Sequence, residues 1–353
     1  MSPDDGGSFP AVCPAPARTN DVVLLGHGGG GRASHDLLER VFLRAFQHPA
    51  LSARDDQAQL DLGGGRLAFT TDAFVVSPAV FPGGCLGSLA VHGTVNDLAC
   101  SGATPLWLSA AWIIEEGTPL ALLHRLVDGM RMAAEAAGVH VVTGDTKVVE
   151  KGKGDGVFVV TSGIGRLDPA RPRLTAANGR AGDVLLVSGT LGDHGLAVLA
   201  ARERLQIDGL SSDSAPLHTL ARALLDAAPG ARCLRDPTRG GLAASLVELS
   251  RAAGVAAEVE EAALPVSDAV RGASELLGLD PLHVANEGKL VAIVPAAEAE
   301  AALAAWRAHP LGRRAARVGE LRAGRPGELS VRARAGGRRL VELPWIDPLP
   351  RIC

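Results

Sequence analysis

The sequence predicts a two-domain protein of the α/β or α+β class. Short apolar runs alternate with helical patterns over residues 21–167 and again over 184–343, the order expected when strands and helices pack together. The chain has 353 residues, more than a single hydrophobic core usually serves. Between the two regions, residues 168–183 are rich in Pro, Gly and small polar residues, which predicts a linker.

The first domain is expected over residues 21–167, after a proline-bearing segment, 1–20, that we expect to be a flexible leader. Its clearest helix is predicted over Thr118–Ala137, opened by Thr118 and Pro119 and closed by Gly138. Its expected strands lie in DVVLL, RLAFTTDAFVV, LWLSAAWII, GVHVVTGD and GVFVVTSGIG.

The second domain is expected to begin with the strand VLLVSG and to contain a later strand, KLVAIVP. Helical patterns occupy 196–205, 215–227, 242–253 and 296–308. After this domain, three prolines in residues 344–353 exclude a helix and favour an extended, solvated segment. We therefore predict a mobile tail that ends in the thiol of Cys353.

Composition argues against several classes of partner. The formal net charge of -4, with only seven Phe and four Trp, gives no basic or aromatic surface typical of nucleic-acid binding. No apolar run reaches the roughly 20 residues that span a bilayer, and the first residues lack a signal-peptide pattern. Five cysteines without a C-x-x-C pair fit a reducing compartment, so we expect a cytoplasmic protein.

A glycine-rich turn, GHGGGGRAS at 26–34, separates a predicted strand from a predicted helix. Such glycines let backbone N–H groups approach phosphate oxygens at a helix start. Arg32 and Ala33 stand where a P-loop needs Lys and Ser or Thr, which excludes that motif. An ordinary loop is the alternative.

Acidic residues interrupt several apolar segments. Asp72 lies in a strand-like run, Asp97 follows Asn96 in a helix-like run, and Asp145 follows VVTG. A buried carboxylate needs a partner, and Mg²⁺ takes a few carboxylates together with phosphate oxygens. Helix or turn capping is the alternative for each residue alone. Lys147, two residues after Asp145 on an expected strand, would face the same side, or it is an ordinary surface lysine.

Two further residues could carry chemistry. Glu287, in an Asn-Glu-Gly turn before a strand, is placed to act as a general base or is only a turn residue. Cys353 is a potential nucleophile and acyl carrier, with an incidental terminal cysteine as the alternative. The segment RDPTRGGLA places Asp236 before an apparent helix start.

Taken together, a set of motifs closely resembles the HypE family of hydrogenase maturation factors, in the PurM-like superfamily of AIR synthase-related proteins. The resemblance runs from about Leu24 to Cys353 and is carried by HGGGG, TTDAFVVSPAVFPGG, GTVNDLACSGA, VTGDTKVV, SGTLGDHG, RDPTRGGLA, ANEGKLV and PRIC. It implies a homodimer whose N-terminal domain forms half of a β-barrel and whose C-terminal domain is an α/β sandwich.

The resemblance also implies a reaction. A HypF-type carbamoyltransferase would place a carbamoyl group on Cys353, and this chain would use ATP and Mg²⁺ to dehydrate it to an S-cyanate. The cyanide would pass to iron held by a HypC–HypD complex during assembly of a NiFe hydrogenase centre.

Carried over residue by residue, the resemblance assigns Lys147 and Glu287 to catalysis beside Cys353. The residues implied to bind ATP are His27, Gly28, Gly29, Gly30, Gly31, Asn96, Asp97 and Asp145, and those implied to hold Mg²⁺ are Asp72, Asp97, Asp145 and Asp236.

This chain departs from the family pattern at three positions. Family members read GGDIGKLA where this chain has GGCLGSLA, so Cys85 and Ser88 replace an acid and a lysine, and Gly29 replaces a serine. Two competing interpretations are selenophosphate synthetase, which the surroundings of Cys13 do not fit, and a non-catalytic scaffold that docks assembly factors.

Overall fold

A computed structural model describes residues 32–37, 39, 58–61, 65–345 and 349–353. The predicted leader and the loop His27–Gly31 lie outside these residues. The first described helix, α1 (Arg32–Leu37), begins directly after the glycine run, where the sequence predicts a helix.

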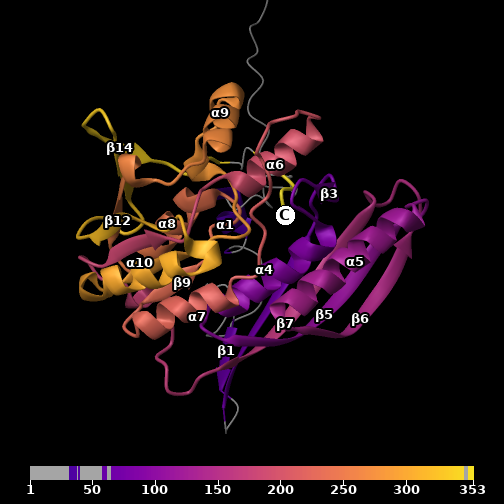
Figure 1. Ribbon diagram of the computed structural model, residues 1–353, viewed down its shortest axis with the longest axis horizontal. Helices are drawn as coiled ribbons and strands as arrows, with labels where there is room; N and C mark the ends of the chain where they lie inside the picture. Colours follow the sequence, from indigo (N-terminus) through magenta and orange to yellow (C-terminus); the bar gives the residue numbers. More distant parts are fainter. Residues whose placement is uncertain (1–31, 38, 40–57, 62–64, 346–348) are drawn as a thin grey trace, which may run out of the picture.

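The N-terminal domain is a five-stranded sheet with helices on one face. Its strands follow the order β1-β2-β7-β5-β6, with β5 and β6 parallel and the other neighbours antiparallel. Helices α4 (Leu86–Cys100) and α5 (Leu120–Ala137) cover that face (Figure 1). The strands are β1 (Ala58–Asp61), β2 (Arg66–Phe74), β5 (Thr104–Glu115), β6 (His140–Val149) and β7 (Val157–Leu167), and a small hairpin joins β3 (Val80–Phe81) to β4 (Gly84–Cys85).

The other face of this sheet is accessible. Phe69 and Trp107 point away from the helices and are 43% and 47% exposed. The single chain thus contains an open sheet. The expected β-barrel would need the sheets of two chains, and it stays a prediction.

Helix α5 confirms the clearest predicted helix. Pro119 occupies its N-cap, and Gly138 ends it with a φ of 67°, a left-handed conformation that favours glycine. Among the described helices, none combines the length and apolarity needed to cross a membrane.

The C-terminal domain is a seven-stranded mixed sheet, in the order β14-β13-β10-β12-β8-β11-β9, with only the β10–β13 pair parallel. Its strands are β8 (Val184–Val187), β9 (Cys233–Arg235), β10 (Ala256–Glu260), β11 (Val291–Val294), β12 (Ala316–Arg322), β13 (Leu329–Arg332) and β14 (Arg338–Val341). Its helices are α6 (Asp193–Arg202), α7 (His218–Ala227), α8 (Gly241–Ala252), α9 (Asp268–Leu277) and α10 (Ala299–Ala308).

Strand β8 is buried on both faces, which explains its continuous apolar sequence. Leu185 and Val187 join the core under α8, whereas Val184 and Leu186 join the core under α7 and α10. The second domain is therefore a layered α/β sandwich, as predicted. The first domain contacts it through α4, which packs against α7 and β9.

Candidate functional site

Four carboxylates from both domains form what we call the acidic cluster: Asp72 on β2, Asp97 on α4, Asp236 just after β9 and Glu287 just before β11. The side chains of Asp72 and Asp97 share a hydrogen bond, and Thr70 Oγ1 donates a second one to Asp97 Oδ2 at 2.6 Å. Repulsion from the charge of Asp72 raises the pKa of both Asp236 and Glu287. The fold thus places Asp72 within a hydrogen bond of Asp97 and within electrostatic range of Asp236 and Glu287, the predicted base.

Burial raises the pKa of Asp72, Asp236 and Glu287. The pKa of Asp236 rises to about 6, through burial first and then repulsion from Asp72. The pKa of Glu287 rises well above its usual value, through burial and then the charges of Asp236 and Asp213. Arg239, two residues before α8, opposes the rise at Asp72 and Glu287 without cancelling it. Burial and mutual repulsion therefore make full ionisation of the cluster unfavourable, and Arg235 and Arg239 do not offset this.

One oxygen of the cluster has no partner. Glu287 Oε1 is buried and accepts no hydrogen bond from any described residue. An unsatisfied buried carboxyl oxygen is costly, and it is the kind of atom that a cation or a substrate N–H would satisfy.

The helix after the glycine-rich loop lies close to this cluster. His35 on α1 contacts Glu248 Oε1 at 3.1 Å, and Glu248 Oε2 accepts from Arg235 Nη1 at 3.2 Å. Arg235 directly precedes Asp236. The chain that leaves the predicted phosphate loop is thereby tied to the second domain next to the acidic cluster.

Asp145 and Lys147 do not join the acidic cluster within one chain. The register pairs them with Ala111 and Ile113 of β5, on the exposed face of the sheet, while Asp72 faces α4 on the opposite side. They bind each other, with 2.6 Å between Lys147 Nζ and Asp145 Oδ2. Side chains alternate between the two faces along the edge strand β6, and this alternation places Asp145 and Lys147 on the face opposite Asp72.

Asn96 forms hydrogen bonds between the two domains. Its side chain is fully buried, and its Nδ2 donates to the carbonyls of Ala215 and Glu287 at 3.1 and 3.2 Å. Its Oδ1 accepts from Leu217 N at 2.8 Å. Both amide hydrogens bind carbonyls of the second domain, so Asn96 joins the two domains, and its predicted nucleotide contact stays a prediction.

The C-terminal segment 349–353 is docked in the protein, contrary to the predicted solvated tail. Leu349, Ile352 and Cys353 are buried in the core shared by α4, α5 and α6. Val75 N donates to a main-chain carboxylate oxygen of Cys353 at 3.1 Å, and Figure 1 shows the chain end beside β3 and α6. The described part of the segment, 344–345 and 349–353, contains no helix, as predicted, but its apolar side chains Leu349 and Ile352 are buried.

His194 links the docked tail to the acidic cluster. Burial lowers its pKa, so the ring is neutral, and a carbonyl only accepts. Nε2 therefore donates to the Ile352 carbonyl at 3.0 Å, and Nδ1 accepts from Ser212 Oγ at 2.8 Å. The next residue, Asp213, accepts from the backbone N of Glu287 at 3.1 Å. Contacts through His194, Ser212 and Asp213 thus connect the backbone of Ile352 to the backbone of Glu287.

Asp213 and Lys289 form a buried ion pair behind Glu287, with 2.9 Å between Lys289 Nζ and Asp213 Oδ2. Burial alone would raise the pKa of Asp213, but the charge and hydrogen bond of Lys289, with the hydrogen bond from the Glu287 backbone N, outweigh it and hold that pKa low. Sequence reasoning missed this pair. Lys289 follows Glu287 by two residues and carried a usable signal, whereas Asp213 sits in a polar loop that gave none.

The two departures at the start of α4 lie away from the acidic cluster. Cys85 is the N-cap of α4, and Ser88 Oγ accepts from Cys85 N at 3.0 Å. Gly129 of α5 approaches so closely that a Cβ there would lie 2.3 Å from Cys85 Sγ. Cys85 and Ser88 thus cap the start of α4, and Cys85 packs against α5.

Comparison with known proteins gives a consistent result. The N-terminal and C-terminal domain models of AIR synthase related proteins match residues 54–167 and 180–332. The chain is 53% identical over 333 residues to carbamoyl dehydratase HypE of Cupriavidus necator, covering 94% of this chain and 95% of that protein. With the HypE of Escherichia coli it shares 50% over 337 residues, 94% and 99% of the two chains.

Solved structures agree with these matches. A crystal structure of hydrogenase maturation protein HypE in complex with ATP matches at 45% identity with a TM-score of 0.79, over 94% of this chain and 100% of that one. The HypE chain of a HypE–HypF complex matches at 45% with a TM-score of 0.82, over 87% and 99%. This chain belongs to the HypE family of carbamoyl dehydratases, with the mixed α/β two-domain fold of the AIR synthase-related proteins.

Proposed function

We propose that this chain is an ATP-dependent carbamoyl dehydratase that converts a carboxamide on the sulfur of Cys353 to an S-cyanate for hydrogenase maturation. The observation that carries the proposal is the position of the C-terminal segment: His194 binds the Ile352 carbonyl, and Asp213, next to the Ser212 that binds His194, accepts from the backbone N of Glu287. The substrate is then carried on the chain itself, and we propose that its reacting group is delivered from this segment to the predicted base.

The proposed chemistry has two steps. In the first, the amide oxygen attacks the γ-phosphorus of ATP, the bond to the bridging oxygen of ADP breaks, and one N–H proton leaves. In the second, the C–O bond breaks with release of phosphate, a second N–H proton leaves, and the C≡N bond of the S-cyanate forms. The S-carboxamide and ATP are thereby converted to the S-cyanate, ADP and phosphate, with no oxidant or reductant.

Glu287 is the proposed base. A neutral amide oxygen is a poor nucleophile, so loss of the N–H proton must accompany its attack. The pKa of Glu287, raised by burial and by neighbouring acids, brings its basicity closer to that needed to accept such a proton at neutral pH. Its unpartnered Oε1 is the atom placed to do so.

We propose that Asp72, Asp97 and Asp236 hold Mg²⁺ together with the ATP phosphates. Among the described residues, no three His, Cys or acidic side chains are already gathered for a metal ion. Magnesium commonly uses one or two carboxylates and takes its remaining oxygens from phosphates and water, so a preformed protein cage is not required. When bound, the ion would supply charge neutralisation for phosphoryl transfer.

A homodimer built on the open face of the N-terminal sheet is the proposed assembly. That face presents exposed Phe69, Trp107 and Ile113, an apolar surface next to the unpaired edge of β6. Asp145 and Lys147 lie on the same face, so we propose that they act at the subunit interface and not within one chain.

The proposed partners follow from the position of the thiol. Cys353 is only 9% exposed in its dock, so the tail must leave to be carbamoylated by a HypF-type enzyme and again to deliver cyanide to a HypC–HypD complex. No disulfide joins any two of the four described cysteines, which agrees with the proposed cytoplasmic location.

Intact-protein mass spectrometry tests the proposal. After mixing with a HypF protein, carbamoyl phosphate and MgATP, the C-terminal peptide should first gain a carbamoyl group and then lose one water. Cys353→Ala should abolish the first change, and Glu287→Gln only the second, while the exposed control Glu300→Gln keeps both. Carbamoylation without ADP release in the unmodified protein would instead favour a scaffold.

A further inference from the structure

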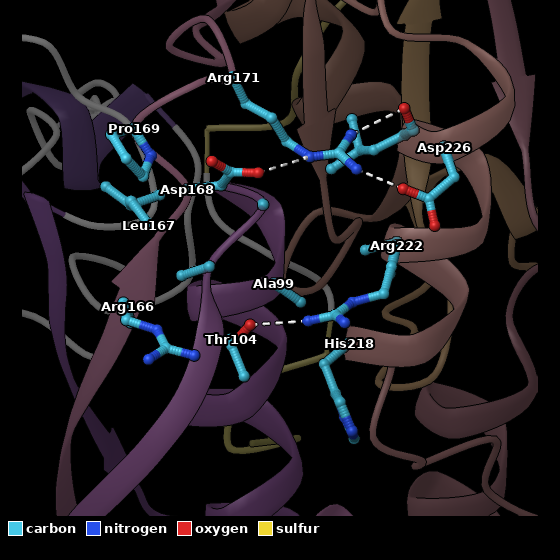
Figure 2. Close-up of a pocket in the computed structure, with 14 residues that line it drawn as sticks. Ala99, Thr104, Arg166, Leu167, Asp168, Pro169, Arg171, His218, Arg222 and Asp226 are labelled. Carbon is cyan, nitrogen blue, oxygen red and sulfur yellow. Dashed lines mark hydrogen bonds and ion pairs between the residues drawn. The ribbon is translucent and has the colours of Figure 1, made fainter.

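A separate cavity of about 510 Å³ lies at the junction of the two domains. Its walls come from the start of β5, the end of β7, the linker and α7 (Figure 2). None of the four residues of the acidic cluster lines it. Ala99 of α4 does, and because side chains two apart on a helix diverge by about 200°, Ala99 and Asp97 face different spaces.

The charges of the cavity are separated into two groups. On the linker side, Arg171 binds Asp226 and the Leu225 carbonyl, and its Nε lies 3.8 Å from Asp168 Oδ2. The acidic side chains of the cavity are therefore engaged by one arginine. Figure 2 shows this group apart from Arg166 and Arg222.

Arg166 and Arg222 lie on the other side of the cavity, with His218. Neither arginine forms an ion pair with any described residue, and the Nη2 of Arg222 is oriented by Thr104 Oγ1 at 2.7 Å. Two guanidinium groups without a compensating carboxylate are well suited to an oxyanion, because each presents a fork of N–H donors.

His218 adds an unsatisfied polar atom at the same place. Its Nδ1 is buried and has no hydrogen-bond partner among the described residues. Burial and the charge of Arg222 lower its pKa, so the ring is neutral at physiological pH and can donate or accept one hydrogen bond.

The rest of the lining is apolar and comes from small or aliphatic side chains. Ala99, Ala103, Ala221 and Leu225 contribute to it. A phosphate ion alone would leave much of the cavity empty, whereas a compact organic body would cover these side chains.

We propose that this interdomain cavity binds a small organic phosphate, with the phosphoryl group between Arg166 and Arg222 and the organic part against the alanines. A dianionic phosphoryl group matches the two uncompensated guanidinium groups, and His218 can take one of its oxygens. The site is distinct from the acidic cluster, and its ligand is not the ATP of the proposed reaction.

Calorimetric titration of the full chain saturated with MgATP tests the proposal, with phenyl phosphate as the probe. Phenyl phosphate should bind more tightly than inorganic phosphate, which lacks the organic body, and more tightly than benzoate, which carries a single charge. Absence of binding at millimolar concentrations, or equal binding of all three probes, would overturn the assignment.

Substitutions locate the binding. Arg166→Gln and Arg222→Gln should each weaken phenyl phosphate binding about tenfold or more, with a smaller loss in Arg222→Lys, which keeps the charge but not the fork. The control Arg313→Gln removes the same charge from an exposed position in the second domain and should change nothing. Thermal melts verify folding of each variant, and unchanged binding in both Gln variants would place the probe elsewhere and refute the site.

Discussion

Replacing Asp236 with Asn should stabilise the nucleotide-free protein while removing a proposed Mg²⁺ ligand. The folded protein holds the pKa of Asp236 at about 6, above its ordinary value of 3.8, because the side chain is buried near Asp72. A carboxyl whose pKa is raised by folding favours the folded state only while it is protonated. Stability is therefore lost as the pH rises from about 4 to above 6. Asn cannot ionise, so the variant should not lose this contribution.

The size of the effect follows from the two pKa values. The difference between 3.8 and about 6 corresponds to roughly 3 kcal/mol once the side chain is ionised. Near pH 8, Asp236→Asn should raise the melting temperature by on the order of 5 °C, and near pH 4.5 by much less. Differential scanning fluorimetry across this pH range, without nucleotide, measures the difference directly.

A matched control and a ligand arm complete the design. Asp208→Asn removes an exposed carboxylate and should leave the melting temperature unchanged at every pH. Adding MgATP should stabilise the unmodified protein more than the variant, since Asp236 is a proposed ligand. Parallel pH profiles for variant and parent would show that Asp236 is not strained, and the argument for an undercompensated acidic cluster would fail.

Three further changes test other parts of the structure. His194→Phe removes the donor to the Ile352 carbonyl, worth ~1 kcal/mol, and should speed alkylation of Cys353 about fivefold by peptide mass spectrometry; an unchanged rate would show that His194 does not hold the tail. Asn96→Ala breaks three interdomain hydrogen bonds and should cost about 3 kcal/mol in urea unfolding, whereas a loss below ~1 kcal/mol would contradict its role in joining the domains. Ile113→Glu places a charge on the open sheet face and should give a monomer in light scattering, and a persistent dimer would point to another interface.

The sequence could predict those features that depend on local chemistry. The cap residues of α5 mark its ends because proline and glycine have restricted or unusual φ angles. Asp72 was recognisable because a carboxylate in an apolar strand needs a partner, and Asp97 supplies a hydrogen bond to it. Both arguments require knowledge of only a few neighbouring residues.

Other features depend on which elements meet in three dimensions. Asn96 and Asp97 are adjacent, yet α4 turns one toward the loop before α7 and the other toward β2, so only Asp97 belongs to the acidic cluster. Asp145 and Asp72 each follow the pattern of an acid in a strand, but their strands present them on opposite faces of one sheet. No local pattern distinguishes these cases, because the outcome depends on which other elements of the fold pack against each helix or strand face.

The C-terminal segment shows how a local rule can be right about conformation and wrong about location. Prolines do exclude a helix, but Leu349 and Ile352 are apolar and find a site between α6 and the end of β2. Burying these two side chains contributes about 4 kcal/mol, and roughly five hydrogen bonds contribute about 5 kcal/mol more. Ordering five residues costs about 8 kcal/mol, and the positive φ of Arg351 adds ~1 kcal/mol, so gain and cost nearly cancel. A tail docked this weakly can leave for a partner enzyme and return, as the proposed carriage of the substrate on Cys353 would require.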